Sequence, residues 1–421
     1  MAEQSRFAEV QRTLSIPNFR NYMAGNFVSQ IGMWTQRIGV QVLTWELTES
    51  PFWLGAMAFA DLFPIVLLGP VGGVMADRLN PLWSLRAYIA LSGVLSAMIA
   101  GIAFAGHMNE YILLILVCAN GCVLAFNYPL RVSIVPALVT PAALTSAISI
   151  NSVCFSIARF GGPALAGFML AQWTDHGTQL AISFTVFADI VFIMALCWVT
   201  LLRPLKVKEN KPLREVPGEL VEGFRYIRNH PGLVPLIVIL VMTSLFGRPF
   251  TDLFAGFSDQ VFDMGKVGVS WLTSVQGIGA IIGSAVLATH SGVIGLTRKM
   301  VFTMLVVSIA ILGFVATDVF WFALICTAVG GYALVVIGVI ELSLMQASVD
   351  ESVRGRVSAV YIICSRGCPA FGALMMGTLA EFAGFRWPIA GGAVICLLVW
   401  MWARSRQDQL AKALEKTPNN R

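Results

Sequence analysis

The stretch RPLKVKENKPLREVPGELVEGFRYIRNHP, residues 203–231, is the longest polar segment of the chain and falls almost at its middle. Six long apolar runs precede it and six follow it. The sequence is 57% hydrophobic and only 12% charged, whereas a soluble domain carries about 25% charged residues. Because a helix needs roughly 20 apolar residues to cross the hydrocarbon core of a bilayer, the apolar runs predict membrane-spanning helices.

The twelve runs predict an all-α membrane protein with twelve transmembrane helices in two pseudo-symmetric six-helix bundles. They cover residues 20–46, 53–76, 84–105, 111–136, 143–172, 179–202, 233–257, 268–289, 300–316, 319–345, 357–381 and 387–403. We expect an N-terminal bundle in residues 1–202, a cytoplasmic linker in 203–231, and a C-terminal bundle with a cytoplasmic tail in 232–421. From Glu215 to Arg228 the linker alternates charged and apolar residues, which favours an amphipathic surface helix over a flexible tether.

Lysine and arginine are distributed unevenly between the two sides of the predicted spans. With a cytoplasmic amino terminus, 21 of the 28 basic residues fall in cytoplasmic segments, five lie inside spans, and only Lys266 and Arg386 fall in outer loops. Cytoplasmic loops carry such an excess, so we predict a multi-pass protein of a bacterial cytoplasmic (inner) membrane with both termini cytoplasmic. Residues 1–19 are polar, so we expect no cleavable signal peptide. The net charge of +5 then reflects topology, and we expect no nucleic-acid binding.

The two halves contain similar stretches. GPVGGVMADRLNPLWSLR (69–86) and GIGAIIGSAVLATHSGVIGLTRK (277–299) each have a pair of glycines four residues apart, then a polar turn, then basic residues. ARFGGPALAGFML (158–170) and SRGCPAFGALMMG (365–377) each have an arginine shortly before a proline, followed by small residues. Such internal repeats are typical of secondary transporters, and they indicate duplicated halves.

The stretch GGVMADRLNPLWSLR (72–86) resembles the signature of the major facilitator superfamily between its second and third helices. Gly73, Asp77 and Arg78 match that signature, whereas residues 80–82 depart from it. Within the superfamily the chain is most similar to the enterobactin-exporter-like branch, which includes macrolide-efflux relatives. Four stretches carry this similarity: residues 18–55, 127–139, 147–167 and 354–380. The resemblance implies a transporter that works by alternating access between its two bundles.

The resemblance also implies a cytoplasmic gate. Asp77 and Arg78 end the second apolar run, and Arg131 lies near the cytoplasmic end of the fourth. In the family, the acidic position helps to hold the cytoplasmic face closed against the start of the eleventh helix, whose N-terminus attracts an anion. We therefore predict a gate formed by Gly73, Asp77, Arg78 and Arg131. A static ion pair that stabilises one bundle is the alternative.

The fifth run contains ARFGGPALAG (158–167), which loosely resembles the glycine–proline element of the superfamily's antiporters. Gly162, Pro163 and Gly167 fit this element, Arg159 precedes it, and alanines replace two of its glycines. The resemblance implies a seal against proton leak at the interface between the halves, as expected of an exporter. Small residues equally permit ordinary close helix packing, which is the competing interpretation.

Charged residues lie inside several of the predicted spans, where they usually face a cavity or a partner. Asp61 and Arg37 lie on consecutive antiparallel helices, so they could meet. A buried carboxylate can bind and release a proton, and we predict that Asp61 with Arg37 couples transport to protons, with Asp189 as the alternative. Salt bridges that only fix the packing are the competing interpretation.

Further polar side chains within the runs are candidates for the wall of a central cavity. They are Gln30, Gln36, Asn127, Asn151, Arg248, Gln276 and Arg366. The sequence has no Walker-type loop, so we do not expect ATP to be the energy source. All eight cysteines fall in apolar runs, which favours buried thiols over a metal site. We expect no cofactor, no bound metal and no enzymatic activity.

The function expected from these observations is proton-coupled export of a small organic molecule, such as a siderophore-like metabolite or a drug. The expected partners are the substrate, protons and the lipid bilayer, and the resemblance implies a monomer. An importer of a small nutrient on the same fold is the first alternative. A membrane scaffold or sensor without transport activity is the second, although the cytoplasmic segments are too short to hold a signalling domain.

Overall fold

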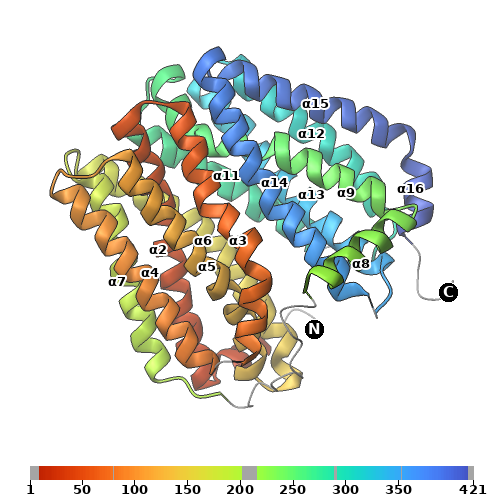
Figure 1. The fold of residues 1–421 in the computed structure, drawn as a ribbon, viewed down its shortest axis with the longest axis horizontal. Helices are drawn as coiled ribbons and strands as arrows, with labels where there is room; N and C mark the ends of the chain where they lie inside the picture. Colours follow the sequence, from red (N-terminus) through yellow and green to blue (C-terminus); the bar gives the residue numbers. More distant parts are fainter. Residues whose placement is uncertain (1–8, 79, 202–215, 289–291, 352, 416–421) are drawn as a thin grey trace. The chain divides into compact units, whose positions relative to one another are not determined.

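The computed structural model describes residues 9–78, 80–201, 216–288, 292–351 and 353–415, and these residues form helices joined by short turns (Figure 1). The first six long helices are α2 Pro17–Thr48, α3 Pro51–Arg78, α4 Pro81–Phe104, α5 Glu110–Leu138, α6 Leu144–Gln172 and α7 Gly177–Cys197. Helix α8, Val216–Asn229, lies where the linker sequence predicts a helix. Then follow α9 Leu233–Met242, α10 Phe254–Gly256, α11 Gly265–Ala288, α12 Leu296–Ala316, α13 Phe320–Ser348, α14 Arg354–Ala383, α15 Arg386–Ser405 and α16 Gln407–Leu414.

Among the described residues, eleven helical segments are long and apolar enough to cross a membrane. Helix α2 is long as well, with 32 residues, but it carries charges along its length and is less apolar. These segments confirm the predicted all-α membrane fold.

Residues Asn80 and Pro81, which depart from the superfamily signature, start α4. The Asn80 side chain accepts hydrogen bonds from two backbone amides, and Pro81 occupies the first turn, where it has no N–H to leave unpaired.

The chain divides into two compact units. The first comprises Met1–Leu43 and Leu67–Lys211, and the second comprises Thr44–Val66 and Pro212–Arg421. The segment Thr44–Val66, the end of α2 and the first part of α3, therefore packs with the C-terminal half of the sequence. The predicted division into bundles at residues 202 and 232 stays a prediction.

A stripe of glycines on α2 brings it close to α7 in the first unit. Gly25, Gly32 and Gly39 are spaced seven residues apart, and a Cβ atom on any of them would come within 2.7 Å of an α7 side chain. Two helices whose small residues face each other can approach until their backbones nearly touch. The residues between these glycines on α2 are consequently held against the middle of α7.

The seventh spanning helix, Leu233–Val261, is not a continuous α-helix. After α9 it passes through a π-helical turn at Thr243–Gly247, a 3₁₀ turn at Pro249–Leu253, and a second π-helical turn at Phe257–Val261. Pro249 lacks a backbone N–H and cannot continue the α-helical ladder. Along the interrupted part, buried aromatic rings stabilise the segment: Phe250, Phe254 and Phe257 all pack against Phe314 of α12.

The segment Thr44–Val66 packs along α14 in the second unit. At one close approach, Gly377 of α14 faces the backbone of α3, where an added Cβ would lie 2.5 Å from the Pro51 carbonyl oxygen. Glu381 accepts hydrogen bonds from the Ser50 hydroxyl (2.7 Å) and the Phe52 amide (3.3 Å) at the start of α3. A carboxylate at a helix N-terminus is favoured by the unpaired amides there.

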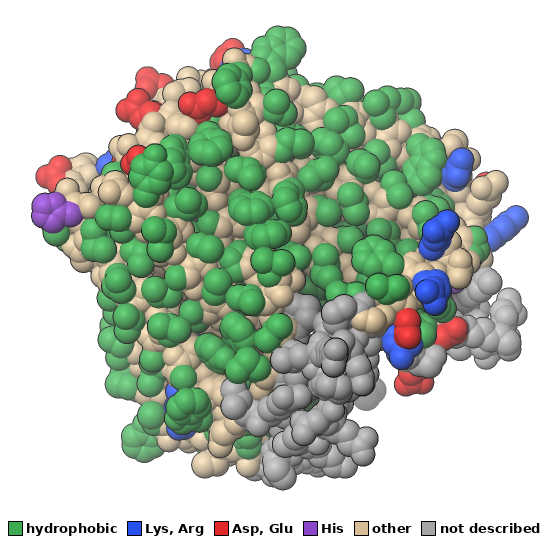
Figure 2. Space-filling model, viewed as in Figure 1, with side chains coloured by type: hydrophobic (Ala, Val, Ile, Leu, Met, Phe, Trp, Pro, Cys, Tyr) green, Lys and Arg blue, Asp and Glu red, His purple; other side chains and the backbone are tan. Residues whose placement is uncertain are grey.

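Two short amphipathic helices pack against the second unit. Helix α8 contacts α14 through an ion pair between Arg356 and Glu222 (2.7 Å). Helix α16 buries its leucines against α12 and α13, and the Glu415 carboxylate that follows accepts hydrogen bonds from the Gly295 and Thr297 amides, both at 2.7 Å. Hydrophobic side chains cover most of the face drawn in Figure 2, as expected of a surface in contact with lipid.

Candidate functional site

Two acidic side chains are buried among the described residues, and no other charged side chain is. Asp189 of α7 is 5% exposed and belongs to the first unit, and Glu341 of α13 is 0% exposed and belongs to the second. Each has one carboxylate oxygen that accepts a hydrogen bond and one that has no partner: Oδ2 of Asp189 and Oε2 of Glu341. Buried polar atoms are nearly always hydrogen-bonded, and these two are the carboxylate oxygens among the twelve buried side-chain atoms of the described residues that have no partner.

Arg131 of α5 organises the polar network around Asp189. Its guanidinium donates from Nη1 to Asn26 (2.7 Å), from Nη2 to the Ser29 hydroxyl (3.0 Å), and from Nε to Asn127 (2.8 Å). The Ser29 hydroxyl in turn donates to Oδ1 of Asp189 at 2.9 Å. One hydroxyl group therefore separates the guanidinium from the carboxylate, and the network joins α2, α5 and α7.

An apolar core lies directly beside this network. The Arg131 guanidinium sits over the Phe192 ring at 4.9 Å, a cation–π contact. Tyr22 packs edge-on against the same ring and donates a hydrogen bond to the Arg131 carbonyl oxygen at 3.4 Å. Tyr22 and Phe192 are fully buried members of the hydrophobic core formed by α2, α4, α5, α6 and α7. A charge in these surroundings interacts strongly with its few polar neighbours.

The second network, around Glu341, is smaller. Oε1 of Glu341 accepts a hydrogen bond from the Thr243 hydroxyl at 3.4 Å, and Thr243 begins the first π-helical turn of the seventh spanning helix. The Arg248 guanidinium attracts the Glu341 carboxylate. The Arg248 guanidinium lies over Gly338, which is one helical turn away from Glu341 on α13. The Tyr361 hydroxyl of α14 donates to the Gly338 carbonyl oxygen at 3.2 Å.

The structure places the predicted pair Arg37 and Asp61 in different units. Arg37 is exposed, and its guanidinium lies 5.7 Å from the Trp34 ring, while the Arg159 guanidinium of α6 lies 5.4 Å from the same ring. Trp34 thus brings two arginines of the first unit together. Asp61 is half-buried in the second unit. Its coupling to Arg37 stays a prediction.

The structure describes the surroundings of only one of the four residues of the predicted gate. Gly73, Asp77 and Arg78 belong to the C-terminal part of α3, but their side chains are outside the described residues. The fourth member, Arg131, is engaged in the network with Ser29 and Asn26. A gate of these four residues stays a prediction.

The antiporter-like element lies in α6. Gly162 packs on α2, where an added Cβ would meet the Ile31 carbonyl oxygen at 2.9 Å, and the Thr35 hydroxyl donates to the Gly162 carbonyl oxygen at 3.1 Å. Pro163 and Gly167 are buried in the same helix. Close packing inside the first unit therefore accounts for Gly162, and a role of the element in antiport stays a prediction.

The predicted cavity residues have different surroundings. Asn127 and Asn151 belong to the Arg131 network, Asn151 as the acceptor for Asn26 at 3.3 Å. Gln36 accepts a hydrogen bond from the buried Ser96 at 2.9 Å, which fixes it between α2 and α4. The remaining four are Gln30, which is buried with an unpartnered Oε1, Gln276, which is buried, Arg248, which is half-buried, and Arg366, which is exposed.

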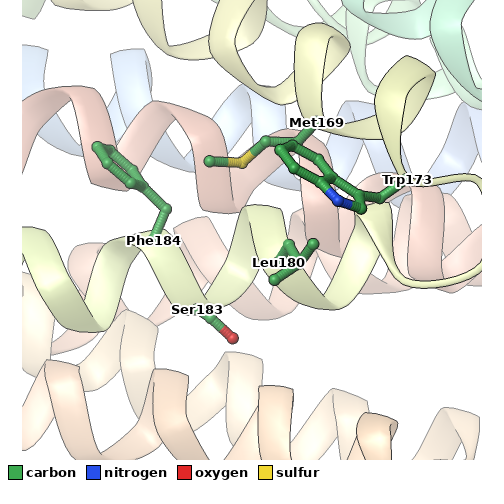
Figure 3. A pocket seen from close by; sticks show the side chains of 5 residues that line it. All are labelled: Met169, Trp173, Leu180, Ser183 and Phe184. Carbon is green, nitrogen blue, oxygen red and sulfur yellow. The ribbon is translucent and has the colours of Figure 1, made fainter.

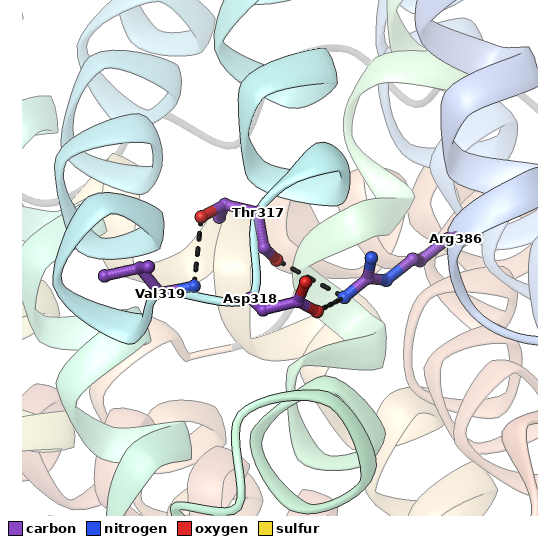
Figure 4. Close-up of polar contacts among 4 residues, drawn as sticks. All are labelled: Thr317, Asp318, Val319 and Arg386. Atoms are coloured by element: carbon purple, nitrogen blue, oxygen red, sulfur yellow. Dashed lines mark hydrogen bonds and ion pairs between the residues drawn. The ribbon is translucent and has the colours of Figure 1, made fainter.

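Two further features lie away from the buried networks. An open pocket of about 400 Å³ between α6 and α7 is lined by Met169, Trp173, Leu180, Ser183 and Phe184 (Figure 3). Its walls are almost entirely apolar, so it offers nothing to select a polar substrate. At the start of α15, Arg386 forms an ion pair with Asp318 and donates to the Thr317 carbonyl oxygen at 3.4 Å (Figure 4).

Sequence reasoning did not single out Asn26 and Ser29, the α2 residues that connect Arg131 to Asp189. The residue type of Ser29 gives no indication, because small hydroxyl residues are common where membrane helices pack, and Asn26 lies near the polar start of its apolar run. The seven-residue spacing of Gly25, Gly32 and Gly39 is the pattern that could have identified them. It marks the α2 face that approaches another helix, and Asn26 and Ser29 lie beside that face.

The fold matches solved transporters over almost its whole length. A bacterial homologue of the human lysosomal transporter Spinster aligns with 95% of this chain and 98% of its own, at a TM-score of 0.69 and 15% identity. The peptide transporter POT in complex with sulfate aligns with 94% of this chain and 96% of its own, at a TM-score of 0.73 and 12% identity. These likenesses show that the chain shares its helical fold with solved transporters.

The chain belongs to the major facilitator superfamily of transporters, in the family described as transmembrane secretion effector, whose model matches residues 10–421. Similar curated proteins include the staphyloferrin A transporter of Staphylococcus aureus, 24% identical over 92% of this chain and 96% of that protein. Macrolide efflux protein A of Enterococcus faecalis is 23% identical over 72% and 93%, and the enterobactin exporter EntS of Shigella boydii is 22% identical over 95% and 96%. The resemblance predicted from the sequence is confirmed.

Proposed function

We propose that this transporter exports a small organic molecule from the cell and that inward movement of protons drives the export. Two of the similar proteins are named for export or efflux, one of a siderophore and one of macrolides. A siderophore-like metabolite or a drug is accordingly the substrate class we favour. The observation that carries proton coupling is the buried Asp189, whose Oδ2 has no hydrogen-bond partner.

Asp189 is suited to bind the proton because of its two kinds of neighbour. Placing a charged carboxylate at depth in a membrane costs roughly 2.5–3.5 kcal/mol, and Arg131 and the Ser29 hydroxyl offset part of this cost. A proton on Oδ2 removes the charge and with it the attraction to Arg131. Arg131 keeps its bonds to Asn26 and Asn127, so protonation loosens α7 from α2 and α5 without breaking the rest of the network.

The protein acts as a monomer in a bacterial cytoplasmic membrane, with both termini on the cytoplasmic side. The distribution of lysine and arginine supports this orientation. The two basic residues assigned to outer loops are both ion-paired, Lys266 with Glu46 and Arg386 with Asp318.

The experiment is paired mass spectrometry of medium and cell extract from a deletion strain complemented with wild-type protein, Asp189→Asn, or Asp175→Asn. Asp175 lies exposed in the turn between α6 and α7 and serves as the matched control. We expect a compound that accumulates inside the deletion strain and disappears from its medium. Wild type and Asp175→Asn restore its release, whereas Asp189→Asn does not.

Two other results would contradict the proposal at different points. A compound that stays in the medium of the deletion strain, and is taken up on complementation, identifies an importer. Release by Asp189→Asn at the wild-type level, with export still abolished by a protonophore, keeps proton-driven export but removes Asp189 from the coupling.

A further inference from the structure

The fourth spanning helix of each half carries a charged residue at the same position. Helices α5 and α13 both have 29 residues. Arg131 lies 21 residues after Glu110, the first residue of α5, and Glu341 lies 21 residues after Phe320, the first residue of α13. The equivalent position thus holds a base in the first unit and an acid in the second.

The partners of the two residues are equivalent as well. Arg131 bonds to Asn26 and Ser29 of the first spanning helix of its unit. Glu341 bonds to Thr243, which belongs to the first complete spanning helix of the C-terminal half. Each unit therefore joins its first and fourth helices through one buried polar network, and each network contains one arginine and one buried acid.

Glu341 is the more deeply buried of the two acids. It is 0% exposed, its Oε1 has only the long 3.4 Å bond from Thr243, and its Oε2 has no partner. An unsatisfied buried oxygen costs about 1–3 kcal/mol, and on a carboxylate such an oxygen is free to bind a proton. A proton on Oε2 would remove the charge that makes this position costly.

We propose that Glu341 is a second proton-binding site of the transporter, located in the C-terminal unit and separate from Asp189. This inference rests on the proposed proton-driven transport. The proton comes from water and binds Oε2, the carboxylate becomes a neutral carboxyl group, and no covalent bond in the protein breaks. Release to water on the other side of the membrane restores the carboxylate.

The charged groups around Glu341 connect the proton to the shape of the seventh spanning helix. From that helix, Arg248 attracts the carboxylate, and from α14, Tyr361 interacts with Glu341, Arg248 and Arg366. Helices α11 and α12 also pack on α13, and their basic residues lie in their first turns. Arg248 lies between the π-helical turn and the 3₁₀ turn. Protonation of Glu341 therefore removes the negative charge that attracts Arg248 at this interruption of the helix.

The test is infrared difference spectroscopy of the purified full-length protein during a pH titration, which records the carbonyl stretch of protonated carboxyl groups. The variants are Glu341→Gln, Asp189→Asn and, as a control, Glu351→Gln, an exposed glutamate close to the end of α13. We expect the wild type and the control to show two buried carboxyl bands. Glu341→Gln loses one of them and Asp189→Asn loses the other.

The outcomes separate this inference from the function it rests on. A Glu341→Gln spectrum identical to wild type, together with loss of a band in Asp189→Asn, overturns the inference and leaves proton coupling at Asp189 intact. Retention of both bands in both variants overturns the inference and also removes Asp189 as a proton-binding site. If Glu341→Gln does not fold, judged by size-exclusion chromatography, Glu341→Asp is used instead: a shift in one band's frequency supports the site, and an unchanged band refutes it.

Discussion

At the scale of single residues, Arg131 has the most demanding position, because its guanidinium serves three acceptors on two helices. Lysine keeps the charge but is a point donor that cannot reproduce the planar fork of arginine. Replacing it therefore changes geometry more than electrostatics.

We expect Arg131→Lys to lower the free energy of unfolding by about 1–3 kcal/mol, the cost of leaving buried acceptors unpaired, and to reduce transport at least tenfold. Thermal unfolding of the purified protein and the release assay measure the two effects. Arg298→Lys, on an exposed arginine at the start of α12, is the control and should change neither. Wild-type stability in Arg131→Lys would mean that the three hydrogen bonds contribute little.

Ser29 allows a test that leaves both charges in place. Its hydroxyl accepts from Arg131 and donates to Asp189, so Ser29→Ala removes the only atom between the two charges. We expect a folded protein whose transport has a changed pH profile, since the carboxylate loses its single hydrogen bond. Ser92→Ala, on a half-buried serine of α4, is the comparison, and an identical profile in Ser29→Ala would argue against coupling through this hydroxyl.

At the scale of secondary-structure elements, the contact between α2 and α7 depends on the absence of side chains at three positions of α2. At Gly32 an added Cβ would lie 2.7 Å from the Ala188 Cβ and 3.2 Å from the Thr185 backbone. Because the obstruction includes backbone, the two helices must separate to accommodate a larger residue.

We expect Gly32→Val to destabilise the protein by about 1–3 kcal/mol, the usual cost of overpacking, and to reduce transport by separating Ser29 from Asp189. Gly161→Val is the control, because no neighbouring atom lies within 4 Å of a Cβ at that position. Equal unfolding temperatures for the two variants would contradict the packing described here.

The N-terminus of α12 depends on a residue far along the chain. The Glu415 carboxylate accepts from two backbone amides there, next to Gly295, which adopts φ 82°. Loss of such a cap costs about 0.5–2 kcal/mol, so we expect Glu415→Ala to lower the unfolding temperature and to speed hydrogen exchange at the first amides of α12. Glu415→Gln, which keeps one acceptor, should be intermediate. Unchanged exchange would show that the cap contributes nothing.

At the scale of the whole molecule, the orientation in the membrane gives a direct prediction. Alkaline phosphatase fused after His107, in the turn between α4 and α5, should be active, because the proposed topology puts that turn outside the cytoplasm. A green fluorescent protein fused to the carboxyl terminus should fluoresce, since it folds in the cytoplasm. The opposite pattern in both fusions would invert the proposed topology.

Most of the helical fold could be predicted from the sequence because a bilayer imposes one requirement, length in apolar residues, that can be read locally. The predicted spans therefore lie close to the observed helices. The interruption of the seventh spanning helix was not predicted, because Pro249 indicates a break but no residue type marks a π-helical turn. The packing of Thr44–Val66 with the second unit was not predicted either, since it depends on contacts with α14, more than 300 residues away.

The candidate site was predicted only in part. Asp189, Arg131 and Asn127 were selected because a charge or an amide in an apolar run is conspicuous by itself. Ser29 was not selected, because its importance comes entirely from a neighbour 160 residues away. The sequence favoured Asp61 over Asp189 because of its position along the helix. Burial of the side chain favours Asp189, and burial cannot be read from the sequence.

The cap on α12 also has a consequence for synthesis on the ribosome. Gly295 and Thr297 are translated about 120 residues before Glu415, so α12 enters the membrane while two of its amides lack their acceptor. Three further spanning helices must be inserted before the carboxylate is made. The C-terminal bundle is therefore completed only after translation of Glu415, and nascent chains stalled earlier should be far more sensitive to membrane proteases than finished ones.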